Sequence, residues 1–358
     1  MIRALVSLGT SFFVNILLIH ILIKIAHKKK WYDPKSSRKN HTGDIPCIGG
    51  VGVFLSFFFA LLTILIITIV QKQDMFSVPY LKIIPILAGF IIIHVLGLFD
   101  DFSNLKARYK LIIQILAATC VVSSGLVFTK FTIPLFWIDI PLGPFSYVIT
   151  VFWIVSVCNA VNLIDGIDGL AGGISSIAAL FLGIISLFNN NIIMAVFSFS
   201  LFGGILSFLF FNMPPAKIFM GDAGSLFIGF TLAVIPLLNV SVNPSSMVLI
   251  TPITLLLIPI LDTFAAIMRR RRKKQSIGMP DKEHLHHKLL NIGLSHKKIL
   301  FIIYSISIFL GGVAVFWDLS KAWIAGSYKI FHTVVIMIVW STGIGLLTII
   351  HFINKKKN

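Results

Sequence analysis

Long apolar segments separated by short polar ones follow one another along the whole chain of 358 residues. A helix that crosses a lipid bilayer needs about 20 mostly apolar residues. Eleven segments meet this requirement and predict membrane-spanning helices over residues 5–26, 48–70, 81–99, 111–129, 146–164, 169–188, 192–211, 224–239, 247–268, 299–317 and 332–353. The pattern therefore predicts an all-α polytopic membrane protein with about eleven transmembrane helices.

The composition supports this class and excludes others. Hydrophobic residues make up 57% of the chain and charged residues 12%, about half of the roughly 25% that a soluble domain carries. The three cysteines form neither a disulfide framework nor a paired metal motif. The net charge of +17 raises the question of a nucleic-acid partner, but long stretches carry no charge at all. We therefore expect the lipid membrane as a partner and no nucleic acid.

The basic residues predict the orientation in the membrane. Twenty-three of them fall in one set of inter-span segments and 6 in the other. Because Lys and Arg concentrate in cytoplasmic loops, this split places the N-terminus outside and the C-terminus in the cytoplasm. The first span has no small-residue cleavage site after it, so it is predicted to be a retained helix.

The segment from Lys130 to Pro144 alternates apolar and turn-forming residues, which predicts a small β-hairpin on the outer surface. No internal repeat is visible in the sequence. The chain therefore reads as a single integral domain over residues 1–358, with its motifs between about 38 and 287 and a cytoplasmic histidine-containing loop at 269–298.

Aspartate dominates the 13 acidic residues, and its placement is not random. Five aspartates lie where a predicted span meets the cytoplasm: Asp100, Asp101, Asp165, Asp168 and Asp222. Helix capping explains any single one of them. Five on one membrane face favour a functional site, because carboxylates at a membrane boundary are costly and usually functional. A further aspartate, Asp262, lies within the ninth predicted span.

Asn159, Asn162, Asp165 and Asp168 recur every three residues. On a helix this spacing puts adjacent members on one face, so we expect a continuous polar stripe at the inner end of the fifth span. Amides combined with carboxylates suit Mg²⁺, whereas zinc prefers cysteine and histidine.

Two further clusters combine acidic residues with glycine or basic residues. Asp222 stands between two glycines at the start of a predicted helix, where backbone N–H groups suit a metal–phosphate complex. Asp100 and Asp101 are followed by three basic residues that end with Lys110, which could neutralise phosphates.

The last cluster is His284-Leu285-His286-His287, in the longest cytoplasmic loop. A zinc site lacks a fourth ligand here, and a solvated basic loop is the structural alternative. We favour histidines that contact a phosphate or a sugar.

Together these motifs resemble the polyprenyl-phosphate N-acetylhexosamine-1-phosphate transferase superfamily. DDxxxL-x4-K begins at Asp100, NxxNxxDGIDGLAGG at Asn159, FNxPxAKxFMGDAGS at Phe211 and HLHH at His284, in one order on one membrane face. A first-loop motif, RKxH-x4-P-x2-GG, begins at Arg38. The form HLHH is similar to the GlcNAc-1-phosphate branch, whereas the phospho-MurNAc-pentapeptide translocase usually has three consecutive histidines.

The resemblance implies transfer of an N-acetylhexosamine-1-phosphate, favouring GlcNAc, from a UDP-sugar to undecaprenyl phosphate, with release of UMP. Such an enzyme starts cell-envelope glycan assembly at the bacterial cytoplasmic membrane and faces the cytoplasm. The implied cofactor is Mg²⁺, with Mn²⁺ as the alternative, and a homodimer is one expected assembly. By resemblance the metal ligands are Asn162 and Asp222, the catalytic residues are Asp100, Asp101, Asp165, His284, His286 and His287, and the substrate contacts are Lys110, Asn159, Asp168, Asn212 and Phe219, with Phe219 as a shelf for uracil.

Three alternatives stay open at this point. The donor could be UDP-MurNAc-pentapeptide, as in peptidoglycan synthesis. A transporter also uses intramembrane carboxylates, but its site lies near the bilayer midplane rather than at one edge. The lipid phosphate could attack the donor directly, which we favour, or an aspartate could first form a covalent intermediate.

Overall fold

Helices make up most of the described part of the protein. The computed structural model describes residues 1–32, 45–72, 80–133, 138–240, 249–276 and 284–323, together with seven residues between 334 and 345. The helices are α1 (Ile2–Lys29), α2 (Gly49–Val70), α3 (Tyr80–Ser103), α4 (Ala107–Ser123), α5 (Phe145–Ile164), α6 (Leu170–Phe188), α7 (Ile192–Asn212), α8 (Gly221–Val234), α9 (Leu237–Val240), α10 (Ile250–Leu255), α11 (Leu257–Arg272), α12 (Leu285–Asn291) and α13 (His296–Trp323).

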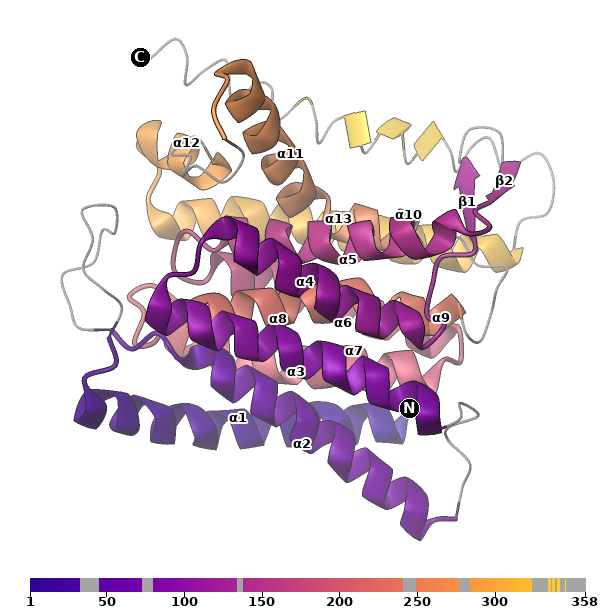
Figure 1. Cartoon of the computed structure of the whole chain (residues 1–358), viewed down its shortest axis with the longest axis horizontal. Helices are drawn as coiled ribbons and strands as arrows, with labels where there is room; N and C mark the ends of the chain where they lie inside the picture. The colour runs from indigo at the N-terminus through magenta and orange to yellow at the C-terminus, as the bar shows by residue number, and fades with distance from the viewer. Residues whose placement is uncertain are drawn as a thin grey trace.

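The long helices lie side by side in one bundle (Figure 1). Within the described residues, seven helices are long and apolar enough to cross a membrane, namely α1, α2, α3, α5, α6, α7 and α13. Many of their large apolar side chains are exposed, as a lipid-facing surface requires. The prediction of an all-α polytopic membrane protein is confirmed at this level.

Three of the predicted spans differ from the helices that form. The fourth, 111–129, ends early because α4 stops at Ser123, and the eighth, 224–239, divides into α8 and α9. The ninth, predicted as one helix over 247–268, divides into α10 and α11 at Leu256. Pro259 explains this break, because proline has no N–H to donate to the carbonyl of Leu255. The last predicted span, 332–353, lies mostly outside the described residues.

Strands β1 (Lys130–Ile133) and β2 (Ile138–Pro141) pair antiparallel where the sequence predicts a hairpin. Lys130 is opposite Pro141, and Ile133 is opposite Ile138. The strands lie at the end of the bundle opposite to α12 (Figure 1). The bundle therefore has two distinct ends, one with the strands and one with the histidine-containing helix.

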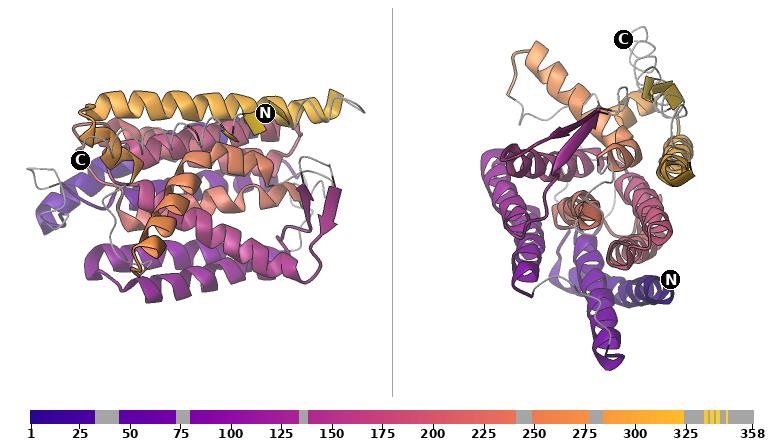
Figure 2. Two further views of the ribbon diagram at one scale, coloured as in Figure 1. Left: turned by 90° about the horizontal axis from the view of Figure 1, so that it is seen from above. Right: turned by 90° about the vertical axis from the view of Figure 1, so that its right-hand side faces the viewer.

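Helix α8 lies in the middle of the bundle and is buried along its length from Ala223 onward (Figure 2). Phe227 of α8 makes edge-on contacts with Phe54 and Phe57 of α2, with ring centroids 5.1 and 5.5 Å apart. Glycines let the neighbouring helices approach its backbone. A Cβ at Gly50 would lie 2.2 Å from the Gly224 nitrogen, so only glycine fits there. This packing fixes the first turn of α8.

Candidate active site

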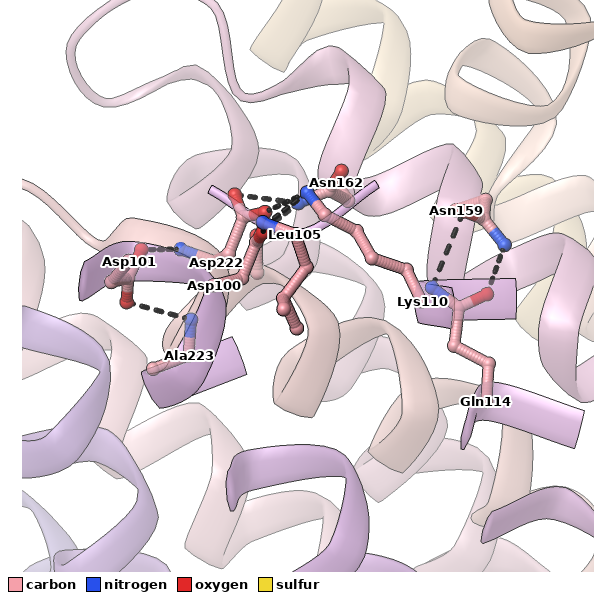
Figure 3. A network of polar contacts seen from close by, with 10 residues as sticks. Asp100, Asp101, Leu105, Lys110, Gln114, Asn159, Asn162, Asp222 and Ala223 are labelled. Atoms are coloured by element: carbon pink, nitrogen blue, oxygen red, sulfur yellow. Dashed lines mark hydrogen bonds and ion pairs between the residues drawn. The ribbon is translucent and has the colours of Figure 1, made fainter. Parts of the chain in front are cut away.

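A polar cluster joins α3, α4, α5 and α8 (Figure 3), at the end of the bundle that carries α12 (Figure 1). Asp100 and Asp101 lie near the end of α3, Lys110 in the first turn of α4, Asn162 near the end of α5 and Asp222 in the first turn of α8. The Lys110 ammonium forms ion pairs with Asp100 and, at 3.0 Å, with Asp222 Oδ2. Asn162 Nδ2 donates to Asp222 Oδ1 at 3.1 Å. Residues from all three acidic motifs thus meet in space.

The two adjacent aspartates make different contacts. Asp101 accepts hydrogen bonds from the backbone N–H groups of Asp222 at 2.6 Å and Ala223 at 3.1 Å (Figure 3). Asp101 therefore caps the N-terminus of α8 from another helix. Its negative charge also interacts favourably with the dipole of α8 at this end. Asp100 instead faces Lys110 and accepts the Leu105 N–H at 2.8 Å. Neighbouring residues on a helix point about 100° apart, which explains why the two side chains contact different groups.

Asn159 lies one turn before Asn162 on α5 and makes a different contact. Its Nδ2 donates to Gln114 Oε1 on α4 at 2.7 Å, and Gln114 Nε2 donates back at 3.4 Å (Figure 3). The reciprocal pair ties α4 to α5 directly beside Lys110. Its predicted role as a substrate contact stays a prediction.

The expected continuous stripe from Asn159 to Asp168 is wrong, because α5 ends at Ile164 and the remaining members lie in a turn. Asp165 is exposed at the end of the helix. Asp168 Oδ2 accepts the Ala216 N–H at 3.1 Å. Asp168 therefore fastens the turn to the segment that leads into α8.

Asn212 joins the turn after α5 to the segment before α8, and Phe219 joins that segment to the first loop. Asn212 Oδ1 accepts the Gly169 N–H at 2.9 Å, and its Nδ2 donates to the Ile218 carbonyl at 2.8 Å. The half-buried Phe219 donates its backbone N–H to the Pro46 carbonyl at 2.7 Å. These backbone contacts bring the first-loop motif, of which residues 45–50 are described, against the start of α8.

The histidine motif begins at an acidic partner. The His284 ring donates from Nδ1 to Asp262 Oδ2 at 2.8 Å, and Asp262 Oδ1 accepts the Leu285 N–H at 2.9 Å. His286 stacks parallel to His284 with ring centroids 6.0 Å apart, and His287 lies 4.2 Å from His286. The three rings therefore form one contiguous group.

His286 connects this group to the other motifs. A Cβ at Gly166 would lie 2.2 Å from His286 Nε2, so the ring lies directly over the turn after α5. His286 is 2% exposed, and neither ring nitrogen has a hydrogen-bond partner in the described part of the chain. Burial and the neighbouring His287 lower the pKa of His286 to about 3, so this ring is neutral at physiological pH. An unpaired neutral imidazole here can both donate to and accept from a ligand.

Three polar residues that hold the site were not selected from the sequence as site residues. Gln114 pairs with Asn159, and Asp262 pairs with His284. Tyr304 of α13 donates its hydroxyl to the Gly169 carbonyl at 2.5 Å. Each lies within a largely apolar helix, and a polar residue there is the signal that could have identified it. The sequence shows that these residues are polar, but not which residue each of them contacts.

The sequence comparisons decide the family. Residues 83–240 match the profile of glycosyl transferase family 4. A Bacillus subtilis protein named "Probable undecaprenyl-phosphate N-acetylglucosaminyl 1-phosphate transferase" is 35% identical over 347 residues, which is 97% of this chain and 94% of the relative. The chain belongs to the polyprenyl-phosphate N-acetylhexosamine-1-phosphate transferases.

Other members of the transferase family are also similar over most of the chain. A Salmonella typhi protein named undecaprenyl-phosphate alpha-N-acetylglucosaminyl 1-phosphate transferase is 30% identical over 329 residues, 88% of this chain and 84% of the relative. A protein of the same name from Escherichia coli strain K12 is 29% identical over 320 residues, with the same two coverages. The family predicted from the motifs is therefore confirmed, and the cluster from Asp100 to Asp222 lies within the matched profile.

Proposed function

We propose that this transferase moves GlcNAc-1-phosphate from UDP-GlcNAc to undecaprenyl phosphate and releases UMP. One observation carries the proposal: Asp100 and Asp222 converge on Lys110 at one end of a membrane bundle that also carries His286, a neutral ring with no hydrogen-bond partner among the described residues. The relatives that are similar over most of the chain are named for this reaction. Both substrates are anions, so the site must supply positive charge and hold the reacting groups in line.

The donor set fits a hard divalent cation. Oxygen atoms of Asp222 and Asn162 would hold Mg²⁺, with Mn²⁺ as the alternative, because such ions prefer carboxylate and amide oxygens. The carboxylates of Asp100 and Asp222 already bind one cationic group, the Lys110 ammonium, between them. When bound, the metal neutralises charge on the transferred phosphoryl group. Lys110 contributes a second positive charge to the same phosphates.

The donor would bind between the histidine group and the loops that lead into α8. His284, His286 and His287 contact its pyrophosphate or sugar, and the unpaired nitrogens of His286 support this assignment. The Phe219 ring serves as the shelf for uracil. Asp165 is exposed and precedes Gly166, over which the His286 ring lies, and we propose that it belongs to the same site. Asp168, Asn212 and Asn159 are the other proposed substrate contacts, and their hydrogen bonds also hold the loops and helices around the site.

Direct attack by the lipid phosphate is the mechanism we favour. Asp101 accepts two backbone hydrogen bonds, and Asp100 accepts one and pairs with Lys110. A carboxylate with donors on its oxygens is a weak nucleophile, which disfavours a phosphoryl-aspartate. Incubation of delipidated protein with labelled UDP-GlcNAc should then release no UMP, whereas a stoichiometric burst with labelled protein would establish the covalent route.

The active site would face the cytoplasm. The cluster lies at the end of the bundle to which the basic loop segments belong, and β1 and β2 lie at the other end (Figure 1). The strands would then lie on the outer side of the membrane. We also propose that the chain forms a single integral domain with eleven spans in the bacterial inner membrane. The homodimer predicted from the sequence stays a prediction.

A donor panel tests the proposal. The purified protein in lipid nanodiscs is given undecaprenyl phosphate and UDP-GlcNAc, UDP-GalNAc or UDP-MurNAc-pentapeptide, and UMP and lipid product are measured. We expect UDP-GlcNAc to be preferred and the activity to be lost with a chelator. Preference for the pentapeptide donor would make the protein a peptidoglycan transferase, and absence of UMP with every donor would refute the reaction class.

A further inference from the structure

We infer that Asp262 is a positioning residue that holds His284 in one tautomer and one orientation. The inference rests on the proposed function, because His284 is placed there as a donor contact. It starts from an observation that the reaction itself does not explain. A carboxylate 5% exposed lies inside a bundle helix, α11, and makes two hydrogen bonds to the start of the histidine motif.

The two contacts fix both the backbone and the side chain of His284. Asp262 Oδ1 accepts the N–H of Leu285, the first residue of α12, at 2.9 Å. Asp262 Oδ2 accepts from His284 Nδ1 at 2.8 Å. The side chain of His284 makes no cap contact with its own helix, so Asp262 supplies the side-chain acceptor for this helix end. One carboxylate thus sets where α12 begins and how the ring is turned.

The chemistry of the pair determines the tautomer. A carboxylate only accepts hydrogen bonds, so His284 Nδ1 must carry a proton. In the neutral ring, Nε2 then has a free lone pair and acts as an acceptor or base. An asparagine at position 262 could instead donate to Nδ1 and thereby move the proton to Nε2. His284 Nε2 would then change from a hydrogen-bond acceptor to a donor, while the shape of the side chain stays the same.

The position of His284 also affects the rest of the site. His284 stacks on His286 with an interplanar angle of 3°, and His286 lies over Gly166 in the turn after α5. A shift of His284 would therefore displace the His286 ring, which lies over Gly166 of the aspartate motif. Helix α11 follows the break at Leu256 and stands at a steep angle to the bundle (Figure 1). Asp262 links this helix to the start of the histidine motif through two hydrogen bonds.

The test compares Asp262→Asn with Asp262→Glu and with Asp318→Asn. Asp318 accepts a hydrogen bond from Asn189 at 2.5 Å at the other end of the bundle, so it serves as a control for the loss of a carboxylate away from the histidine motif. In nanodiscs, we expect Asp262→Asn to lower kcat by about 10²-fold or more, because a wrong histidine tautomer can cost up to about 10⁴-fold. The KM for undecaprenyl phosphate should change little. Asp262→Glu should restore much of the activity, and Asp318→Asn should remain near wild type.

Two readouts separate positioning from a loss of folding. In ¹⁵N-histidine-labelled protein, the His284 signal, assigned by its loss in His284→Gln, should report Nδ1–H in the wild type and Nε2–H in Asp262→Asn. In a His284→Ala background, Asp262→Asn should cause no further loss of turnover. An unchanged tautomer, or additive losses in the double variant, would overturn the inference. The labelled spectrum requires no turnover, so it decides on Asp262 even if the donor panel refutes the proposed reaction.

Discussion

Replacing Asp101 by asparagine should destabilise the N-terminal turn of α8, because its carboxylate contacts the backbone of that turn. The carboxylate caps the first turn of α8 through the N–H groups of Asp222 at 2.6 Å and Ala223 at 3.1 Å. Asparagine can keep one of these bonds with its carbonyl oxygen, but its NH₂ group would face the second N–H. The variant therefore loses one hydrogen bond to a charged acceptor and the favourable charge at the helix N-terminus.

These contacts set the size of the effect. A hydrogen bond to a charged group contributes about 1.5–3 kcal/mol to stability. A negative charge at a helix N-terminus contributes about 0.3–1 kcal/mol. The free energy of unfolding should therefore fall by about 2–4 kcal/mol. Because Asp222 lies in the first turn of α8, we also expect kcat to fall while the KM for the donor changes less.

The assay combines melting temperature with amide hydrogen exchange in detergent micelles. Asp101→Asn should melt below the wild type, and the amides of Asp222 and Ala223 should exchange faster than in the wild type. Asp318→Asn serves as the control, and in it these two amides should be unaffected. If Asp101→Asn retains the wild-type exchange rates but loses activity, then Asp101 contacts the substrate and the capping role assigned to it is wrong.

Three further predictions concern the rest of the site. Asp222→Asn should lower turnover by at least ~10²-fold, because it removes a charge that acts on the transition state; near-normal turnover in a folded variant would contradict this role. Gly166→Ala should reduce activity and melting temperature, since its Cβ would lie 2.2 Å from His286 Nε2, and a double variant with His286→Ala should recover the melting temperature. Stability should fall as the pH drops below about 6.5, because the unfolded chain then protonates His286 while the folded chain, with its pKa lowered to about 3, does not. Between pH 8 and pH 5, the melting temperature should therefore change less with pH in His286→Gln than in the wild type.

Much of the site could be predicted from the chain because its signals are local. Apolar length predicts the helices that span the membrane, and a carboxylate at the end of such a helix is costly enough to indicate function. Asp100 and Asp222 were selected in this way and Asn162 from the three-residue spacing of its motif, and the structure brings the three together. Their roles in catalysis and metal binding stay predictions.

Pairwise contacts could not be predicted, because they depend on how the helices pack. The sequence treats Asp100 and Asp101 as one pair, yet one faces Lys110 and the other caps α8. Asp262 and His284 lie 22 positions apart and meet only because α11 and α12 fold back on each other. Hydrophobic periodicity says which face of a helix is apolar, but not which helix covers it.

The sequence by itself determined the membrane class, the residues of the motifs and the family to which they belong. Only the tertiary structure decided that Asp100 and Asp101 contact different partners and that His286 lies over Gly166. The physical reason is the range of the interactions. Burial in a membrane acts on each segment separately, whereas a hydrogen bond requires two groups, often far apart in the chain, to lie about 3 Å from each other.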